Sequence, residues 1–390
     1  MKVLVLAPHP FYQERGTPIA VDLLLKALCS RGDKVDLLTF HEGNDRSYPG
    51  LKIERIRPWF TISGIQPGFS IKKLICDMHM MIRFLYFMCS RKYDVVHAVE
   101  EAAFMAMFVC PLFKTPYIYD MDSSMTTQLV DKMSLLRHIE GVLRWFEGLP
   151  MRFAQVVIPM CDALAKEAHT RGAKCVVVLK DVSLIEHETK QELALNFRTE
   201  LSANKIIVMY IGNLESYQGI DLLLDSISLI HEKLPELLVI IIGGADVHIE
   251  KYKVIAKKLG IDNVVQFLGK KPVAHMSAYM SQADLLVSPR TKGVNTPMKI
   301  YSYLHSKTAV LATDLPTHTQ VMTEHIGVLA APEKQLFAAA MLKIIRDDKH
   351  RYQLAENAYC YIEQEHSYEV FKQQLYKVYE QLEADKVKTC

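Results

Sequence analysis

Short apolar runs alternate with longer segments of helical period along the whole chain. The runs are continuous and rich in β-branched residues, which is typical of strands buried on both faces of a parallel sheet. In the first half they occupy residues 3–7, 35–40, 52–56, 94–99, 117–121, 155–160 and 175–182. In the second half they occupy residues 206–212, 237–244, 264–269, 284–289, 309–313 and 327–331.

Segments of helical period lie between these runs. One covers residues 20–31 and ends at Gly32, and another covers residues 220–233 and ends near Pro235. Repeating strand–helix units build doubly wound sheets. The pattern therefore predicts an α/β fold with two Rossmann-like doubly wound domains that face each other across a cleft.

The segment 186–204 interrupts this rhythm, because it is polar, charged and without a predicted strand. A chain of 390 residues is also long for a single core. We therefore place an interdomain segment at 186–204, between an N-terminal domain at 1–185 and a C-terminal domain at 205–365. The last residues, 366–390, are predicted to form a C-terminal helix.

Composition and charge exclude several classes of protein. The net charge of +2 is too small to indicate a nucleic-acid partner. The eight cysteines are scattered, without CxxC or zinc-ligand spacing, so we expect reduced thiols and no metal site. That favours the cytoplasm or the cytosolic face of a membrane. The apolar run at the N-terminus ends at Pro8 and Pro10, so it resembles a first strand more than a signal peptide.

Polar residues that follow strands mark the ligand-binding edge of a doubly wound sheet. The first strand is not followed by GxGxxG, which argues against a nicotinamide cofactor. Gly16 and Thr17 instead begin a helix, and the amides of a helix N-terminus attract phosphate or a polar substrate. An ordinary strand–helix loop is the alternative.

Three further residues lie near predicted strand ends in the N-terminal half. His97 is either a hydrogen-bonded core residue or a residue of the site. Asp120 and Asp122 either bind acceptor hydroxyls or a divalent ion, or do structural work such as helix capping. The predicted acceptor-binding residues are Gly16, Thr17, His97, Asp120 and Asp122.

In the C-terminal half, glycines end two neighbouring strands. Gly212 is followed by Asn213, and Gly243 is followed by Gly244. Glycine at such positions lets a nucleotide approach the backbone closely, although tight turns alone would also explain it.

The stretch 288–313 is the densest in polar groups. Arg290, Lys292 and Lys299 flank a helix that is predicted to open at about Pro297. Cations beside a helix N-terminus provide the opposite charge and the hydrogen bonds that a diphosphate requires. A solvated basic loop is the alternative.

Five segments together resemble a known family over nearly the whole chain. They are YDVVHAV, GNLESYQGIDLLL, LLVIIIGGAD, NVVQFLGKKPVAHMSAYMSQADLLVSPR and NTPMKIYSYLHSKTAVLATDLP. The chain resembles family-four (group 1) retaining glycosyltransferases of the GT-B fold. The resemblance implies a nucleotide-diphosphate sugar bound by the C-terminal domain and a glycan or lipid-linked acceptor bound by the N-terminal domain. It also implies transfer of a hexose with retention, no required metal or cofactor, and a final helix that returns to the first domain.

The chain departs from the family at the donor site. The two glutamates of the usual donor motif fall on Val294 and Ser302, and the usual Arg and Lys fall on Asn213 and Gln218. We expect Arg290, Lys292 and Lys299 to hold the diphosphate instead. The predicted donor-binding residues are Gly212, Asn213, Gly243, Gly244, Arg290, Lys292, Asn295, Thr296, Pro297, Lys299 and Ser302. The predicted catalytic residues are His97, Arg290 and Lys299.

Two other functions stay open. One is a catalytically silent GT-B protein that binds nucleotide, sugar or a partner enzyme, and the other is another GT-B enzyme such as an epimerase.

The segment 71–92 is the most apolar helix candidate. Asp77 and Arg83 interrupt it, so it is not a spanning helix. We expect an apolar stripe that faces the core, at residues 71, 74, 75, 78, 81, 82, 85 and 88. Met80, Phe84 and Phe87 extend beyond this stripe, and Lys72, Lys73, Arg91 and Lys92 flank the segment. Burial against the sheet is favoured, and peripheral contact with an anionic membrane is the alternative.

Overall fold

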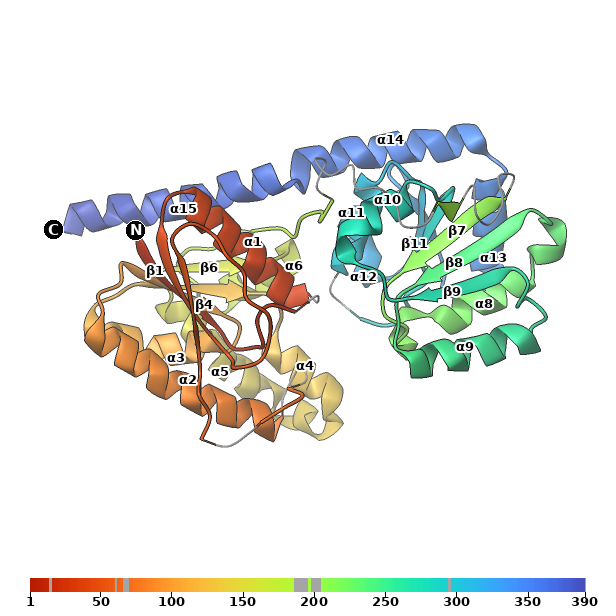
Figure 1. The fold of residues 1–390 in the computed structure, drawn as a ribbon. Coiled ribbons are helices and arrows are strands. Elements are labelled where there is room, and N and C mark those ends of the chain that lie inside the picture. The colour runs from red at the N-terminus through yellow and green to blue at the C-terminus, as the bar shows by residue number, and fades with distance from the viewer. Residues whose placement is uncertain are drawn as a thin grey trace. The chain divides into compact units, whose positions relative to one another are not determined.

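The structure is a computed structural model, which describes residues 1–13, 16–59, 62–65, 70–185, 196–197, 205–293 and 296–389. The chain forms two compact units (Figure 1). Unit 1 contains Met1–Asp181 and Phe371–Cys390, and unit 2 contains Val182–Val370. Most of the predicted interdomain segment, 186–204, lies outside the described residues.

Unit 1 contains a six-stranded parallel sheet in the order β3-β2-β1-β4-β5-β6. The strands are β1 (Lys2–Ala7), β2 (Lys34–Thr39), β3 (Leu51–Arg55), β4 (Val95–Val99), β5 (Tyr117–Met121) and β6 (Val156–Pro159). They form because the apolar runs bury both faces of each central strand. The strand order reverses between β1 and β4, which is the switch point where ligands bind in such sheets.

Helices cover both faces of this sheet. They are α1 (Gly16–Ser30), α2 (Ile71–Ser90), α3 (Ala102–Val109), α4 (Met125–Lys132), α5 (Glu140–Phe153), α6 (Asp162–Thr170) and α15 (Tyr368–Thr389), with short turns η1 (Cys110–Phe113) and η2 (Ser134–Ile139). Figure 1 shows α1 and α15 on one face, and α2, α3 and α5 on the other. Helix α15 is held to α1 where the Tyr376 hydroxyl lies 2.7 Å from Ser30 Oγ, and Arg31 pairs with Glu383 nearby.

Unit 2 repeats the same strand order, as β12-β11-β10-β7-β8-β9. Its strands are β7 (Ile206–Ile211), β8 (Leu237–Ile242), β9 (Val265–Gly269), β10 (Leu285–Ser288), β11 (Val310–Thr313) and β12 (Val328–Ala330). Its helices are α8 (Ile220–Ser228), α9 (Asp246–Lys258), α10 (Met276–Met280), α11 (Met298–His305), α12 (Pro316–Thr319), α13 (Lys334–Ile345) and α14 (Asp348–Glu365), with turns η3 (Ser216–Gln218), η4 (His231–Lys233) and η5 (Val273–His275). The switch point lies between β7 and β10.

The predicted fold class, with two doubly wound α/β domains, is confirmed. One predicted strand is wrong. The run 175–182 forms only an isolated bridge at Val176, although the amides of Val177 and Leu179 donate to the backbone of β6. The chain leaves the edge of the sheet here, because unit 2 begins at Val182.

The predicted orientation of α2 is also wrong. Met80, Phe84 and Phe87 are fully buried. Most of the predicted core stripe points to solvent, with Ile71, Leu74, Met78, Ile82 and Leu85 all exposed. The helix has two apolar faces, and periodicity cannot tell which of them packs. The face with the larger aromatic side chains packs against the sheet, because it buries more apolar area there.

No helix in the described part of the chain is long and apolar enough to cross a membrane.

Candidate functional site

Three segments meet at the switch point of the sheet in unit 2. Gly212 directly follows β7, and Arg290 follows β10 by two residues. The Thr291 amide donates to the Tyr217 carbonyl at 2.9 Å, so the loops after these two strands are joined. Helix α11 then begins with Pro297 in its N-cap position. The predicted cationic segment therefore lies at the ligand-binding edge of this sheet.

Lys299 lies within this edge on the first turn of α11. Its Nζ donates to Gln218 Oε1 at 2.9 Å and lies 4.1 Å from the centre of the Tyr210 ring. Burial lowers the pKa of Lys299 well below its usual value, and the nearby charge of Arg290 lowers it further. These two partners are a neutral amide and a neutral ring. An anion that enters the edge would restore the pKa and provide the counter-charge.

Arg290 is the second cation of this edge. Its Nε donates to the Lys292 carbonyl at 2.7 Å, and its guanidinium carbon lies 5.3 Å from the centre of the Tyr217 ring. Burial lowers the pKa of Arg290 from its ordinary value. The backbone contact and the ring fix the orientation of the guanidinium group, which leaves less conformational entropy to lose when it binds a ligand.

Two glycines allow the loops of this edge to approach one another. Gly219 has φ +74°, and a Cβ there would lie 1.9 Å from the Pro289 carbonyl oxygen. Gly243 has φ +108°, and a Cβ there would lie 2.2 Å from the Gly212 carbonyl oxygen. Larger residues would separate the loops, so the close approach itself requires glycine. Gly244 continues the same turn after β8.

Two predicted donor-binding residues form hydrogen bonds within unit 2. Asn213 Oδ1 accepts from the Glu215 amide at 3.3 Å, as in the turns that asparagine favours. Ser302 Oγ accepts from the Leu184 amide at 3.1 Å and is buried. Ser302 therefore holds the chain that enters unit 2.

The remaining donor-binding predictions differ in exposure. Thr296 is buried at the start of the α11 segment, and Lys292 is exposed. Asn295, like Val294, lies outside the described residues.

His318 is a residue that the sequence analysis missed. It is fully buried on α12, with Nε2 2.9 Å from Ser288 Oγ and Nδ1 2.9 Å from the Thr313 carbonyl oxygen. Burial, with help from Lys299 and Arg290, lowers the pKa of His318 to about 4, so the ring is neutral near pH 7. It joins the ends of β10 and β11 behind the cationic loop. The one sequence signal for this linking role is that His318 follows a predicted strand closely.

The structure places His97 within unit 1 differently from the prediction. His97 is the third of five residues of β4, not a residue at its end. Its ring is fully buried, with Nδ1 2.9 Å from the Tyr379 hydroxyl and Nε2 3.1 Å from Asp120 Oδ2. Both ring nitrogens are therefore occupied, as in a hydrogen-bonded core histidine. In this arrangement neither nitrogen is available to a sugar.

The other predicted acceptor-binding residues gather at the carboxyl edge of the sheet in unit 1. Asp122 hydrogen-bonds to Thr17 at the start of α1, next to the exposed Gly16. Burial raises the pKa of Asp122 well above its usual value, and the charges of Asp120 and Glu100 add to the shift.

Two acids of this edge were missed. Burial raises the pKa of Glu100 to about 7, and it raises the pKa of Asp181 to about 7 with help from Asp120. The edge is thus lined by carboxyl groups that are partly protonated near neutral pH and that can donate to or accept from hydroxyl groups. Among the described residues, no three or more His, Cys, Asp or Glu side chains are arranged so that they could hold a metal ion.

Residues 193–360 match the protein family described as "Glycosyl transferases group 1". The phosphatidyl-myo-inositol mannosyltransferase of Mycobacterium leprae (strain TN) is 23% identical over 353 residues, which cover 89% of this chain and 88% of that protein. The protein of the same name from Mycobacterium tuberculosis (strain ATCC 25618 / H37Rv) is 25% identical over 182 residues, or 44% of this chain and 46% of that protein.

Two solved structures resemble the whole chain. The sucrose-phosphate synthase from Thermosynechococcus elongatus has a TM-score of 0.78 at 19% identity, covering 99% of this chain and 100% of that one. The structure of HepE from Anabaena in complex with UDP has a TM-score of 0.73 at 17% identity, covering 98% of this chain and 100% of that one. The likeness shows that the fold is GT-B.

Proposed function

Because residues 193–360 match the group 1 glycosyl transferases, we propose that unit 2 binds a nucleoside-diphosphate sugar and that unit 1 binds the sugar's acceptor. The acceptor is a glycan or a lipid-linked molecule. The transfer retains the anomeric configuration, as the resemblance to the family implies, and it requires no metal.

The contact between Lys299 and Gln218 carries the proposal for the donor. The family usually has a lysine at the place of Gln218, and here the Lys299 Nζ lies 2.9 Å from the Gln218 side chain. One cation thus reaches nearly the same point from α11 instead of from the loop after β7. Arg290 supplies a second cation at the same edge, and Lys292 a third on its exposed loop.

These cations also define the chemistry of the step. Negative charge gathers on the diphosphate as the bond between the sugar and the diphosphate breaks. Lys299 and Arg290, already oriented and partly desolvated, stabilise that charge in the transition state. The buried Thr296 and the glycines after β7 and β8 line the approach of the nucleotide sugar.

A silent nucleotide-binding protein is the second candidate. Ser302 replaces the second family glutamate, and its Oγ is bound to the Leu184 amide. In the family this glutamate binds the ribose of the nucleotide. Ser302 does not provide that carboxylate, so another residue would have to bind the ribose. A protein that binds nucleoside diphosphate without releasing it from a sugar would fit this second candidate.

The acceptor proposal rests on unit 1. Asp120, Asp122 and Thr17 lie at its carboxyl edge, where hydroxyl groups of an acceptor would find hydrogen-bond partners. The mycobacterial relatives are named for a phosphatidyl-myo-inositol acceptor, which favours a lipid acceptor here too. The exposed apolar stripe of α2, beside Lys72, would hold the protein at a membrane surface that carries such lipids.

Calorimetric titration with UDP, GDP, ADP and dTDP tests the donor proposal. UDP comes first, because the Anabaena structure contains it. We expect one nucleotide to bind the wild type, and Lys299→Gln to bind it about tenfold or more weakly, since a charged hydrogen bond is lost. Lys257→Gln, at an exposed lysine near the end of α9, is the control. Wild-type protein that binds none of these nucleotides would refute the proposal.

A further inference from the structure

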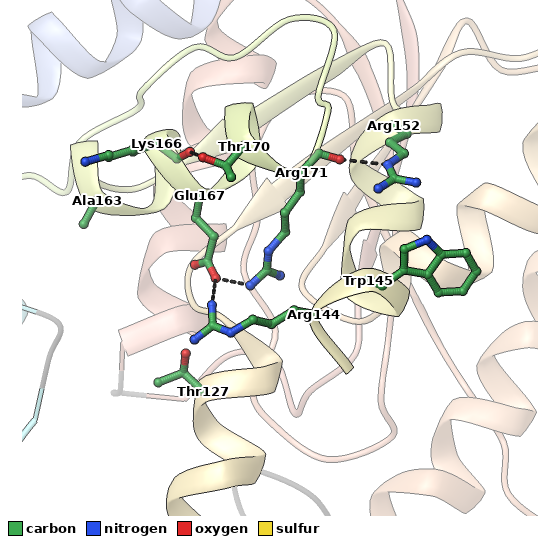
Figure 2. Close-up of a pocket in the computed structure, with 9 residues that line it drawn as sticks. All are labelled: Thr127, Arg144, Trp145, Arg152, Ala163, Lys166, Glu167, Thr170 and Arg171. Atoms are coloured by element: carbon green, nitrogen blue, oxygen red, sulfur yellow. Dashed lines mark hydrogen bonds and ion pairs between the residues drawn. The ribbon is translucent and has the colours of Figure 1, made fainter. Parts of the chain in front are cut away.

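Unit 1 contains a cavity of about 560 Å³ between α4, α5 and α6 (Figure 2). It opens to solvent, and its wall includes Arg144, Trp145, Arg152, Lys166, Glu167 and Arg171. Four of these six side chains are cationic. None of these residues belongs to the donor edge of unit 2, around Lys299 and Arg290, or to the acidic edge of unit 1, around Asp120 and Asp122.

A network of ion pairs holds the floor of this cavity. Arg144 donates to Glu167 at 3.1 Å and to Glu140 at 2.8 Å. Arg171 pairs with Glu167 and with the buried Glu147. Figure 2 shows Arg144 and Arg171 converging on Glu167. These arginines are therefore fixed in place before any ligand arrives, which lowers the entropy cost of binding.

Arg152 and Lys166, the other two cations of the wall, give it positive charge that the glutamates do not neutralise. Arg152 donates from Nε to the Arg171 carbonyl at 2.8 Å, and Lys166 is exposed. In the part of the chain that the structure describes, neither forms an ion pair with a carboxylate, because Glu147 and Glu167 pair with Arg144 and Arg171. In Figure 2, Arg152 lies beside Trp145, and Lys166 lies on the opposite side of the network. A phosphate group, which accepts several charged hydrogen bonds, suits such a wall.

Helix α5, which forms one side of the cavity, buries Pro150 and Met151 and also carries apolar side chains on its outward face. Its inward face carries Glu147, which is only 2% exposed. Its outward face carries Val142, Trp145, Phe146 and Phe153, and the Trp145 side chain is 56% exposed. An aromatic and aliphatic face that points away from the core, next to basic residues, is typical of a helix that lies in a membrane interface.

The cavity also connects this face with the acceptor edge. Its wall includes Thr127 and Ala163, which lie in the first turns of α4 and α6. These helices follow β5 and β6 at the carboxyl edge of the sheet. Helix α2, with its exposed stripe, lies on the same face of the sheet as α5 (Figure 1).

We propose that this cavity binds the phosphate of an anionic membrane lipid while the outward face of α5 enters the same bilayer. The proposal rests on the lipid acceptor proposed above and deepens it. The cationic wall of the cavity attracts the phosphate, and Trp145 lies at the level of the headgroups. The lipid is thus presented beside the edge where the acceptor is bound.

The fluorescence of Trp145 tests the proposal directly, because the chain has only two tryptophans. In the full-length Trp59→Phe variant, Trp145 is the single reporter. The probe is vesicles of phosphatidylcholine, with or without phosphatidylglycerol, that carry brominated acyl chains. We expect a blue shift and quenching on the anionic vesicles. Adding Lys166→Gln should weaken binding about fivefold, and adding Lys34→Gln, at the amino end of β2, should leave it unchanged.

Any one of four results would overturn the proposal. Trp145 that shows no blue shift or quenching rejects insertion of α5. Equal binding with and without phosphatidylglycerol, or no effect of Lys166→Gln, rejects the phosphate site. If inorganic phosphate binds wild type but not Lys166→Gln, and vesicles do not bind, the ligand is a soluble phosphate and not a lipid. Nucleotide titration of Lys166→Gln separates this proposal from the donor proposal, because it should match wild type.

Discussion

The Nζ of Lys299 lies 2.9 Å from Oε1 of Gln218, although 81 residues separate the two in sequence. Helix α11 and the turn η3 before α8 thus deliver one side chain each to the same point of unit 2. The chain thus lacks the usual family lysine at residue 218 and still presents a cation at the same edge of unit 2.

Exchanging the two residues tests this explanation. Lys299→Gln alone should lower turnover about tenfold or more, since one charged hydrogen bond to the diphosphate is lost. The double variant Lys299→Gln with Gln218→Lys should recover part of that loss, because the cation returns from the other side of the contact. Steady-state release of nucleoside diphosphate measures both. If the double variant turns over no faster than Lys299→Gln, a cation at residue 218 does not replace one at residue 299, and the explanation is contradicted.

Gly219 is expected to be necessary for the geometry of the donor edge. Gly219→Ala should lower the free energy of unfolding by about 2 kcal/mol or more, because its Cβ would collide with the Pro289 carbonyl in a left-handed conformation. Gly260 is a matched control, with φ +71° and open space around its Cβ. Gly260→Ala should cost only the backbone strain, about 1 kcal/mol. Urea unfolding measures both, and equal losses would contradict the predicted collision.

His318 should make the stability of unit 2 depend on pH. Its pKa is about 4 in the folded protein, whereas an unfolded histidine has a pKa of about 6.5. The unfolded chain therefore binds more protons between these values, so stability is lost as pH falls from about 6.5 to about 4. His318→Gln removes this contribution, up to about 3 kcal/mol. Thermal unfolding over this range should be less pH-dependent in the variant, and identical slopes would contradict the prediction.

Tyr379 is predicted to act on the stability of unit 1 through His97. Tyr379→Phe leaves a buried ring nitrogen without its partner and should cost about 1–3 kcal/mol. Tyr376→Phe, which removes a hydroxyl at an exposed contact with Ser30, should cost less. Turnover per folded molecule should stay unchanged in both. A selective fall in kcat for Tyr379→Phe would instead support the catalytic role that the sequence predicts for His97.

The sequence predicted every strand that the described residues form, and one further strand, at 175–182, that they do not form. Continuous β-branched apolar runs favour strands that are buried on both faces, so the twelve strands among the described residues follow from the pattern. The resemblance to group 1 glycosyltransferases is confirmed as well. Arg290 and Lys299 could be proposed as ligand-binding residues because they are cations next to the start of a helix.

Contacts between distant segments could not be predicted. His97 meets Tyr379, which is 282 residues away, and nothing near His97 indicates that partner. The two apolar faces of α2 are equivalent in periodicity, and only packing volume distinguishes them. The outward aromatic face of α5 could not be predicted either, because a short amphipathic helix normally turns its apolar face inward.

The central claim is that unit 2 uses its own cations to bind and activate a nucleoside-diphosphate sugar. The most direct measurement supplies a panel of UDP-, GDP-, ADP- and dTDP-sugars, with lipid and glycan acceptors, to the wild type and to Lys299→Gln, and follows release of nucleoside diphosphate. We predict release from one donor by the wild type, reduced about tenfold or more in the variant. Release at the same rate by both proteins, or by neither with any donor, would contradict the claim.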